Sequence, residues 1–462
     1  EAVDWFEFPQ AILSQDGNQS YRWFESGKLN TSYLALDHHV NSGRAEQAAL
    51  IYDSPVTGQQ QTFTYSELRD EVSRFAGVLK NHGVVKGDRI IVYMPMIPQA
   101  IIAMLACARL GAIHSVVFGG FAPYELAVRM SYLLWGGPPD EELYRAADKG
   151  ELGDKPRIEA QIRRMLGDPR AIEQSQRFVY DWLDLGRMDN LAPARAMFPK
   201  WDPSLGGDMR AETLSFFKEV VWTRKRPLTE LLNAQVTFLT PRLARHYGMF
   251  PQGQNFTRYD LTNVPSRGGL LTQGSVLTVG GDQASMVTRG LFVLHELLRG
   301  VVRDPPPGVD TTPVPTKPGL TQRGISTSRL AKASCSGCHA KFEPLAFGLE
   351  KFDGLGAYSQ ADKHGNRLRE DGKILIPGQS SPVAYKTSAE LMNLLAGSPR
   401  VHETFTWKVV QFAMGRPLGA KDARSVTEIH MASQKAGGTY QSLVTAIILS
   451  DLVRYNQPTK DL

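Results

Sequence analysis

The sequence predicts a mixed fold, in which an incomplete N-terminal α/β (βαβ) unit precedes a mainly α-helical, multi-domain region. Two observations support this prediction. Apolar, strand-like segments at Arg89–Met94 and Ile113–Phe118 flank an Ala-rich helical segment, Pro98–Leu110, which is the order of a parallel βαβ unit. From Tyr124 onward, apolar residues recur mostly with helical spacing.

The N-terminal segment carries strong local signals. Thr64 and Glu67 have the spacing of a capping box, which predicts a helix over Tyr65–Asn81 with an apolar face. The apolar and aromatic run 49–53 predicts a strand. Residues 1–30 are polar and aromatic and show no clear period, so no element is predicted there.

The region after Tyr124 is predicted to be largely helical, with Asp140 as an N-cap. The glycine-rich stretch Gly268–Thr278 is predicted as a strand or loop, and Pro305–Pro318 as extended chain. One predicted helix begins at Tyr124, and a second follows the N-cap Asp140. Further helices are predicted over 157–166, 171–185, 211–221, 229–239, 241–247, 286–298, 388–395, 401–414, 422–433 and 440–451.

These signals divide the chain into four predicted parts. Residues 1–123 form the α/β fragment, and residues 124–250 form a helical domain. A third part, 262–360, contains the cysteine motif described next, and a C-terminal helical domain covers 385–456. The aromatic stripe on the predicted helix 171–185 is interpreted as core.

Composition excludes several classes of protein. The 462 residues are 42% hydrophobic and 21% charged, as in ordinary globular proteins. The net charge of +5 includes no dense Lys/Arg run, so no nucleic-acid partner is expected. No apolar run is long enough for a transmembrane segment. The chain begins at Glu1 without an initiator methionine or signal peptide, which predicts a fragment.

The motif Cys335-Ser336-Gly337-Cys338-His339 carries the most chemistry. C-x-x-C-H is the attachment pattern of c-type haem, because two thiols at this spacing reach the vinyl groups and the next histidine lies under the iron. Cys335 and Cys338 are therefore predicted haem attachment sites, and His339 the proximal iron ligand. A chance C-x-x-C or half of a zinc site are the alternatives. Cys107 is the only further cysteine.

Residues beyond the motif complete this hypothesis. Met392, His402 and Met414 are candidates for the distal iron ligand, because each lies downstream on a predicted helix. A methionine ligand would raise the reduction potential. A dense apolar run after the motif is interpreted either as a cover for a porphyrin face or as core, and it includes Phe342, Leu345, Leu349 and Phe352.

The N-terminal segment resembles the acyl-CoA synthetases of the acetyl-CoA and propionyl-CoA ligase type. The resemblance rests on WFESGKLNTSYLALDHHV, TFTYSELRDEVSRFAGVL and KGDRIIVYMPMIPQAIIAMLACARLGAIHSVVFGGFAP. It implies that Phe118, Gly119 and Gly120 lie near the nucleotide of CoA. Taken alone, the two glycines fit a turn that ends a strand.

This family's adenylation chemistry needs a phosphate-binding loop that ends in lysine and a second lysine in a C-terminal domain, and nothing after Ala122 resembles either. The stretch Gly268–Gly281 contains no lysine to complete such a loop. CoA and ATP are therefore cofactors only if the resemblance is functional. Because the later strands of the sheet are missing, exposed sheet edges are expected.

The larger part resembles planctomycete-type multi-domain proteins of unknown function with cytochrome-c-like features. The segments that carry this resemblance are RMSYLLWGGPPDEEL, PLTELLNAQVTFLTPRLARHYG, RGGLLTQGSVLTV, CSGCHAKFEPLAFGLEKFDGLGAY and FTWKVVQFAMGRPL. The resemblance implies an exported, periplasmic protein with haem c and an unknown redox partner. It implies no substrate.

The two resemblances meet in PYELAVRM, so the chain is interpreted as a chimera produced by recombination or by wrongly joined reads. Their compartments differ, since the synthetases are cytoplasmic and haem attachment takes place on the exported side. Three hypotheses follow: a haem c redox protein, an acyl-CoA ligase relative without its adenylation site, and a non-catalytic scaffold. Under the first hypothesis, the chain is a component of a haem c oxidoreductase and is not a competent CoA ligase.

Overall fold

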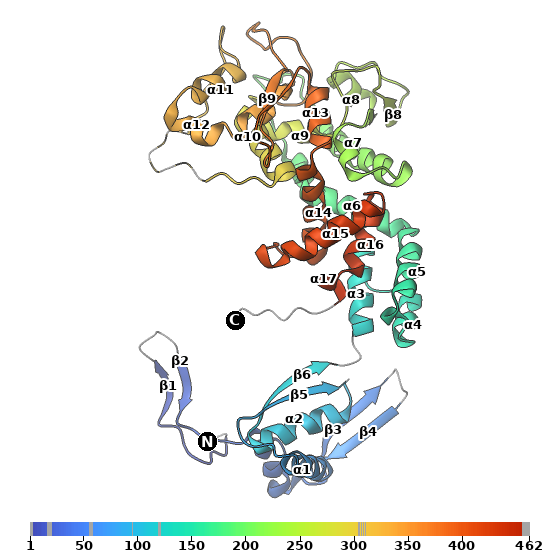
Figure 1. Ribbon diagram of the computed structural model, residues 1–462, viewed down its shortest axis with the longest axis vertical. Coiled ribbons are helices and arrows are strands. Elements are labelled where there is room, and N and C mark those ends of the chain that lie inside the picture. Colours follow the sequence, from blue (N-terminus) through green and yellow to red (C-terminus); the bar gives the residue numbers. More distant parts are fainter. Residues whose placement is uncertain are drawn as a thin grey trace. The chain divides into compact units, whose positions relative to one another are not determined.

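The computed structural model describes residues 3–15, 21–54, 59–94, 96–118 and 122–454, apart from 304, 306, 308 and 310. It divides into two compact units. The N-terminal unit comprises Glu1–Val128 and Asp140–Asp154, and the C-terminal unit comprises Arg129–Pro139 and Lys155–Leu462. An α/β part and a mainly helical part are both present, so the predicted mixed fold is confirmed (Figure 1).

The N-terminal unit contains the predicted βαβ arrangement. Strands β5 (Arg89–Met94) and β6 (Ile113–Phe118) are parallel and in register from Arg89↔Ile113 to Met94↔Phe118. Helix α2 (Pro98–Leu110) connects them, with Pro98 in its first turn and Gly111 in the left-handed conformation at its end. Proline fits there because the first helical N–H groups need no partner within the helix.

Helix α1 (Tyr65–Asn81) has the predicted bounds because its N-terminus is fully capped. Thr64 Oγ1 accepts a hydrogen bond from Glu67 N at 3.2 Å, and Glu67 Oε2 accepts one from Thr64 N at 2.8 Å. Leu68 and Val72 face α2 and form the core of this unit with residues of that helix. The capping box therefore starts the helix, and the apolar face anchors it.

Strand β5 was predicted to be a buried strand, and this is correct for only one of its faces. Val92 is buried, whereas Ile91 and Tyr93 are 71% and 72% exposed. In the part of the chain that the structure describes, β5 pairs only with β6, and the sheet has two strands. The expected exposed sheet edges are therefore present, because no further strand of the described chain pairs with either strand.

Two antiparallel hairpins precede α2. Strand β3 (Ala48–Ser54) contains the predicted strand 49–53 and pairs with β4 (Gln59–Thr64). Strands β1 (Ala11–Gln15) and β2 (Tyr21–Glu25) were not predicted. All five residues of β2 are exposed, so no alternation between buried and exposed positions marks it in the sequence.

Helices dominate the rest of the chain. Asp140 caps α4 (Glu141–Asp148) by accepting from Leu143 N at 2.9 Å, as predicted.

The division between the units falls within α3 (Ala122–Trp135). The C-terminal unit contains α5 (Lys155–Leu166), α6 (Pro169–Trp182), α7 (Ser204–Lys218), α8 (Pro241–His246), α9 (Gly274–Leu277), α10 (Met286–Phe292), α11 (Gln322–Leu330), α12 (Ala333–His339), α13 (Ser388–Ala396), α14 (Pro399–Met414), α15 (Ala423–Lys435), α16 (Tyr440–Leu449) and α17 (Asp451–Arg454), with the short strands β9 (Gly372–Ile374) and β10 (Val383–Tyr385).

The helix predicted over 229–239 is wrong. A 3₁₀ helix, η6 (Leu228–Leu232), is followed by strand β7 (Val236–Leu239). Strand β7 pairs with β8 (Thr257–Asp260) in antiparallel register. The β-branched and aromatic residues of β7 favour this strand once a partner from elsewhere in the chain completes the ladder.

The stretch Gly268–Thr278, predicted as a strand or loop, forms two short helical turns, η7 (Leu270–Thr272) and α9. Gly269 has φ +70°, and a Cβ on it would lie 1.8 Å from the carbonyl oxygen of Leu232. Glycine is therefore needed for close packing against η6, and the stretch is buried core.

The aromatic stripe on α6 is core, as interpreted from the sequence. Phe178 is 2% exposed and stacks with Trp182 at a ring-centroid distance of 5.7 Å. Phe412 and Phe405 of α14 contact these two rings at 5.5 and 5.4 Å in edge-to-face geometry. The stripe therefore joins α6 to the C-terminal helices.

Candidate haem attachment site

The C-x-x-C-H motif lies on helix α12, whose sequence is ASCSGCH. Residues three and four apart share one face of an α-helix, so Cys335, Cys338 and His339 project to the same side. Cys338 is exposed, Cys335 and His339 are half-buried, and both thiols are unpaired. The helix thus presents two accessible thiols and an imidazole together.

A buried carboxylate orients the imidazole of His339. His339 Nδ1 lies 2.9 Å from Glu343 Oε1, one helical turn further along the chain. An ionised carboxylate can only accept, so Nδ1 donates the proton, and in the neutral imidazole Nε2 then carries the free lone pair. Nε2 has no hydrogen-bond partner within the described residues. This is the arrangement in which histidine serves as a metal ligand.

Glu343 is itself held from helix α11. Its side chain has no exposed surface. It accepts from Arg329 Nε at 2.7 Å and from the Ser326 hydroxyl. A buried carboxylate is stable only when it is paired and hydrogen-bonded, and Arg329 supplies the opposite charge. With three donors, Glu343 has little freedom, so it fixes the ring of His339.

The ring of Phe342 supports the same orientation. Its centroid lies 5.0 Å from that of His339, and Phe342 is 3% exposed. The other apolar residues predicted either to cover a porphyrin or to form core are also buried, and the core interpretation is confirmed for them: Leu345, Leu349 and Phe352 are 2%, 2% and 0% exposed.

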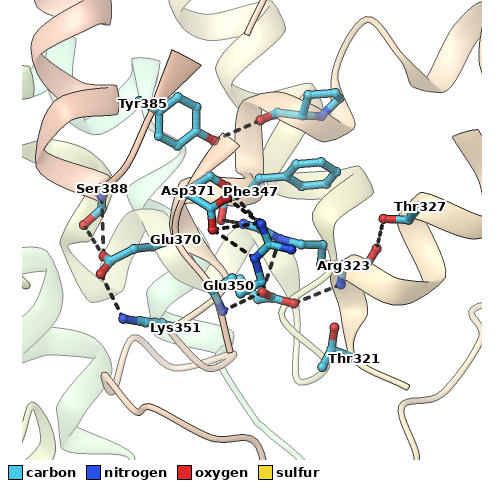
Figure 2. Close-up of polar contacts among 12 residues, drawn as sticks. Thr321, Arg323, Thr327, Phe347, Glu350, Lys351, Glu370, Asp371, Tyr385 and Ser388 are labelled. Carbon is cyan, nitrogen blue, oxygen red and sulfur yellow. Dashed lines mark hydrogen bonds and ion pairs between the residues drawn. The ribbon is translucent and has the colours of Figure 1, made fainter. Parts of the chain in front are cut away.

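Helix α11 is anchored by Arg323, which Figure 2 shows at the centre of a polar network. Arg323 Nη2 donates to Phe347 O at 2.6 Å, and Nη1 donates to Asp371 O at 2.8 Å. Its Nε lies 3.2 Å from Glu350 Oε2. Burial lowers the pKa of Arg323, and the Glu350 carboxylate opposes this shift. These contacts join α11 to the 3₁₀ helix η10 (Glu343–Leu349) and to the segment before β9.

The network continues into α13. Glu350 also accepts from the backbone N–H groups of Arg323 and Arg369, at 3.2 and 2.9 Å. Beside it, Lys351 Nζ lies 2.9 Å from Glu370 Oε1, and Ser388 Oγ donates to Glu370 at 3.3 Å (Figure 2). Helix α11, which carries Ser326 and Arg329, is therefore held in place by η10, by the segment before β9 and, through Lys351 and Glu370, by α13.

The structure does not bring the distal-ligand candidates to His339. Met392 is 1% exposed within α13. His402 Nε2 donates to Ala396 O at 2.8 Å. Figure 1 shows α12 at the edge of the C-terminal unit, apart from α14, which carries His402 and Met414. None of the three is placed as an axial ligand here.

The predicted CoA-binding residues lie at the limit of what the structure describes. Phe118 is the last residue of β6, and Gly119 and Gly120 fall outside the described residues. For the zinc alternative, no group of three or more His, Cys, Asp or Glu residues in the described chain is placed to hold a metal ion. No helix in the described ranges is long and apolar enough to cross a membrane.

Sequence patterns reveal only part of this site. The cysteines and His339 are recognisable from their spacing. Glu343, Ser326 and Arg329 were not predicted as site residues. The i, i+4 spacing of His339 and Glu343 is a signal that could have identified the carboxylate, whereas Ser326 and Arg329 meet it only through the packing of α11 against η10.

Four protein families match successive parts of the chain. Residues 36–133 match the family described as AMP-binding enzyme. Residues 121–249, 267–362 and 383–453 match three families described as proteins of unknown function, DUF1592, DUF1588 and DUF1585. The C-x-x-C-H motif lies within the DUF1588 match.

Individual relatives match the N-terminal part. An uncharacterised protein of Pseudomonas aeruginosa is 63% identical over 28% of this chain and 20% of its own length. The human mitochondrial acyl-CoA synthetase short-chain family member 3 is 50% identical over 29% of this chain and 19% of its own length. Acetyl-coenzyme A synthetase of Sinorhizobium fredii is 51% identical over 28% of this chain and 20% of its own length.

Among solved structures, acetoacetyl-CoA synthetase from Streptomyces lividans matches 28% of this chain and 20% of its own chain, with 29% identity and a TM-score of 0.24. The chain spans about a fifth of the length of the curated relatives that it matches. It therefore joins a fragment similar to the N-terminal part of short-chain acyl-CoA synthetases to a region made of three domain families of unknown function.

Proposed function

We propose that the C-terminal unit is a c-type haem-binding redox module that acts on the exported side of a membrane with a redox partner still to be identified. One observation carries the proposal: Cys335, Cys338 and His339 share an exposed helical face, and Glu343 leaves Nε2 of His339 free. The residues fit the group. Cys335 and Cys338 would form the thioethers, and His339 would bind iron.

The chain's own contribution is orientation. Glu343 accepts the hydrogen bond from Nδ1 of His339, and a hydrogen bond of this kind fixes the tautomer and the orientation of a ligand ring. When bound, the haem would supply a one-electron couple. Arg329 keeps a positive charge beside Glu343, so the carboxylate stays paired in its buried position.

The haem hypothesis predicts covalent attachment. The full chain, fused to an export signal and expressed with haem-attachment machinery, should give a haem-stained band that survives denaturing electrophoresis. Cys335→Ser and Cys338→Ser should each weaken attachment, because one thioether is lost. His339→Ala should keep the attached haem but change its absorption spectrum, because the proximal ligand is missing.

Cys107→Ser is the matched control, since Cys107 is buried in α2 of the N-terminal unit. This variant should retain haem. A colourless wild-type protein under the same conditions would exclude the redox function and favour a non-catalytic scaffold.

The similarity of the N-terminal part to acyl-CoA synthetases supports a second candidate, a ligase relative. Against it, the stretch Gly268–Thr278 is buried, and the N–H groups of two of its glycines already have partners. Gly269 N donates to Ala234 O at 2.9 Å, and Gly274 N donates to the Tyr247 hydroxyl at 2.8 Å. These amides cannot point at a phosphate.

We therefore expect the purified protein to show no acetate- or propionate-dependent exchange of pyrophosphate into ATP. The reaction depends on preorganised groups around the phosphates, and no segment after Ala122 supplies them. A complete acetyl-CoA synthetase, assayed in parallel, provides the positive control. Exchange above the no-enzyme background would support the ligase candidate.

A further inference from the structure

A separate cleft lies in the C-terminal unit between helix α14 and the π-helical turn η9 (Val293–Leu297) with the residues that follow it. Its volume is about 420 Å³, which is in the size range of small-molecule sites. Arg299, Arg400 and Lys408 line it together with Glu296, Trp407 and Val301. We call it the basic cleft. It shares no residue with the haem site.

The charges of the basic cleft do not balance. Lys408 Nζ forms a short ion pair with Glu296 Oε2, at 2.6 Å. Arg299 and Arg400 share a single carboxylate oxygen, Glu403 Oε2, at 3.4 and 3.8 Å. Charge-assisted hydrogen bonds are normally about 2.7–2.9 Å, so both arginines are loosely paired. Three cations facing two carboxylates leave one positive charge.

Arg299 is held in place without a full set of partners. Its guanidinium lies over the ring of Trp407, 4.6 Å from the centroid. Its Nε is buried and has no hydrogen-bond partner in the described part of the chain. Its backbone has φ +49°, in the left-handed region that non-glycine residues rarely adopt. Non-glycine residues in this conformation are enriched at functional sites.

Arg400 is also positioned by the fold. Its Nε donates to Leu298 O at 2.8 Å, which leaves its terminal nitrogens toward Glu403 and the cleft. Burial lowers the pKa of Arg299, and the neighbouring Arg400 lowers it further. The two guanidinium groups therefore repel each other in a partly desolvated position, and an added anion would relieve this repulsion.

We propose that the basic cleft binds a small organic monocarboxylate. A planar carboxylate matches the guanidinium fork of Arg299 or Arg400, and its single charge balances the surplus. An apolar body would lie along Trp407 and Val301, of which Val301 is 84% exposed. A phosphate ester carries two charges and exceeds what the cleft can neutralise.

The test uses the full chain and fluorine NMR with three probes of similar size: 4-fluorobenzoate, neutral 4-fluorobenzamide and 4-fluorophenyl phosphate. We expect 4-fluorobenzoate to bind most tightly. Arg299→Gln and Arg400→Gln should each weaken its binding roughly tenfold or more, because a charged hydrogen-bond donor is lost. Arg424→Gln is the matched control. Arg424 is 90% exposed on α15, so its loss should leave binding unchanged.

A variant counts as folded when its unfolding midpoint equals that of the Arg424→Gln control. If Arg299→Gln does not meet this criterion, the binding result for Arg400→Gln alone tests the proposal. Unchanged affinity in the folded variants overturns the proposal. Equal binding of benzamide and benzoate also overturns it, because the charge would then be irrelevant. Tighter binding of the phosphate overturns the assignment to monocarboxylates.

Discussion

Replacing Arg289 with methionine is expected to lower the free energy of unfolding of the C-terminal unit by about 2–6 kcal/mol, since a buried carbonyl oxygen that loses its donor costs about 1–3 kcal/mol. Arg289 is 1% exposed, and burial lowers its pKa to about 10, so it stays charged at neutral pH. It donates to the carbonyl oxygens of Leu277, Leu349, Phe352 and Asp353, at 3.1 Å for Leu349 and 2.8 Å for Phe352. Methionine fills much of the space but removes all of these donors. Leu349 O and Asp353 O each keep a backbone donor, Phe352 N at 3.1 Å and Gly356 N at 3.2 Å, so the cost falls mainly on Leu277 O and Phe352 O.

Urea unfolding followed by circular dichroism measures this effect. Arg424→Met is the control, because it removes the same groups from a side chain that is 90% exposed and should change stability little. Arg289→Lys should fall between the two, since one ammonium cannot reach all four carbonyls. A loss for Arg289→Met no larger than that of the control would show that the carbonyls find other partners.

Glu212 is expected to make the C-terminal unit less stable as the pH rises through neutrality. The side chain is 2% exposed and accepts from Thr237 Oγ1 at 2.5 Å and from the Tyr247 hydroxyl at 2.6 Å. Burial raises its pKa from 4.5 to about 7, although both hydrogen bonds and Arg267 oppose the shift. The folded state therefore binds this proton more tightly than the unfolded state does.

The direction follows from that difference. The contribution of protonated Glu212 to the free energy of unfolding is complete below about pH 4.5 and is lost as the pH rises through 7. Between pH 5 and pH 8 the wild-type protein should lose about 2–3 kcal/mol more than Glu212→Gln, which cannot ionise. Urea midpoints at the two pH values measure this, and Glu428→Gln, on the exposed side of α15, is the control. Equal losses in wild type and Glu212→Gln would contradict the prediction.

Local signals determined much of the secondary structure. Helix α1 has its predicted bounds because Thr64 and Glu67 cap it within four residues. Helix α2 and strands β5 and β6 were also predicted, since a run of apolar residues bounded by proline or glycine describes each of them. Asp140, also in the N-terminal unit, identified the start of α4 in the same way.

Elements that depend on distant partners were not predictable. Strand β7 was predicted as helix because its partner β8 lies about 20 residues further on, and only the pairing favours an extended chain. The turns at Gly268–Thr278 form because Gly269 packs against Leu232. No local sequence pattern predicts this contact. The hairpin of β1 and β2 buries no face, so it leaves no alternating pattern.

The candidate site shows the same division. The sequence alone determined that two thiols and a histidine share one helical face, because three- and four-residue spacings fix that geometry in any α-helix. Tertiary structure decided which nitrogen of His339 is free, since Ser326 and Arg329 reach Glu343 only after α11 packs on η10. Bonds between distant segments depend on the whole fold, whereas helical spacing depends only on the backbone.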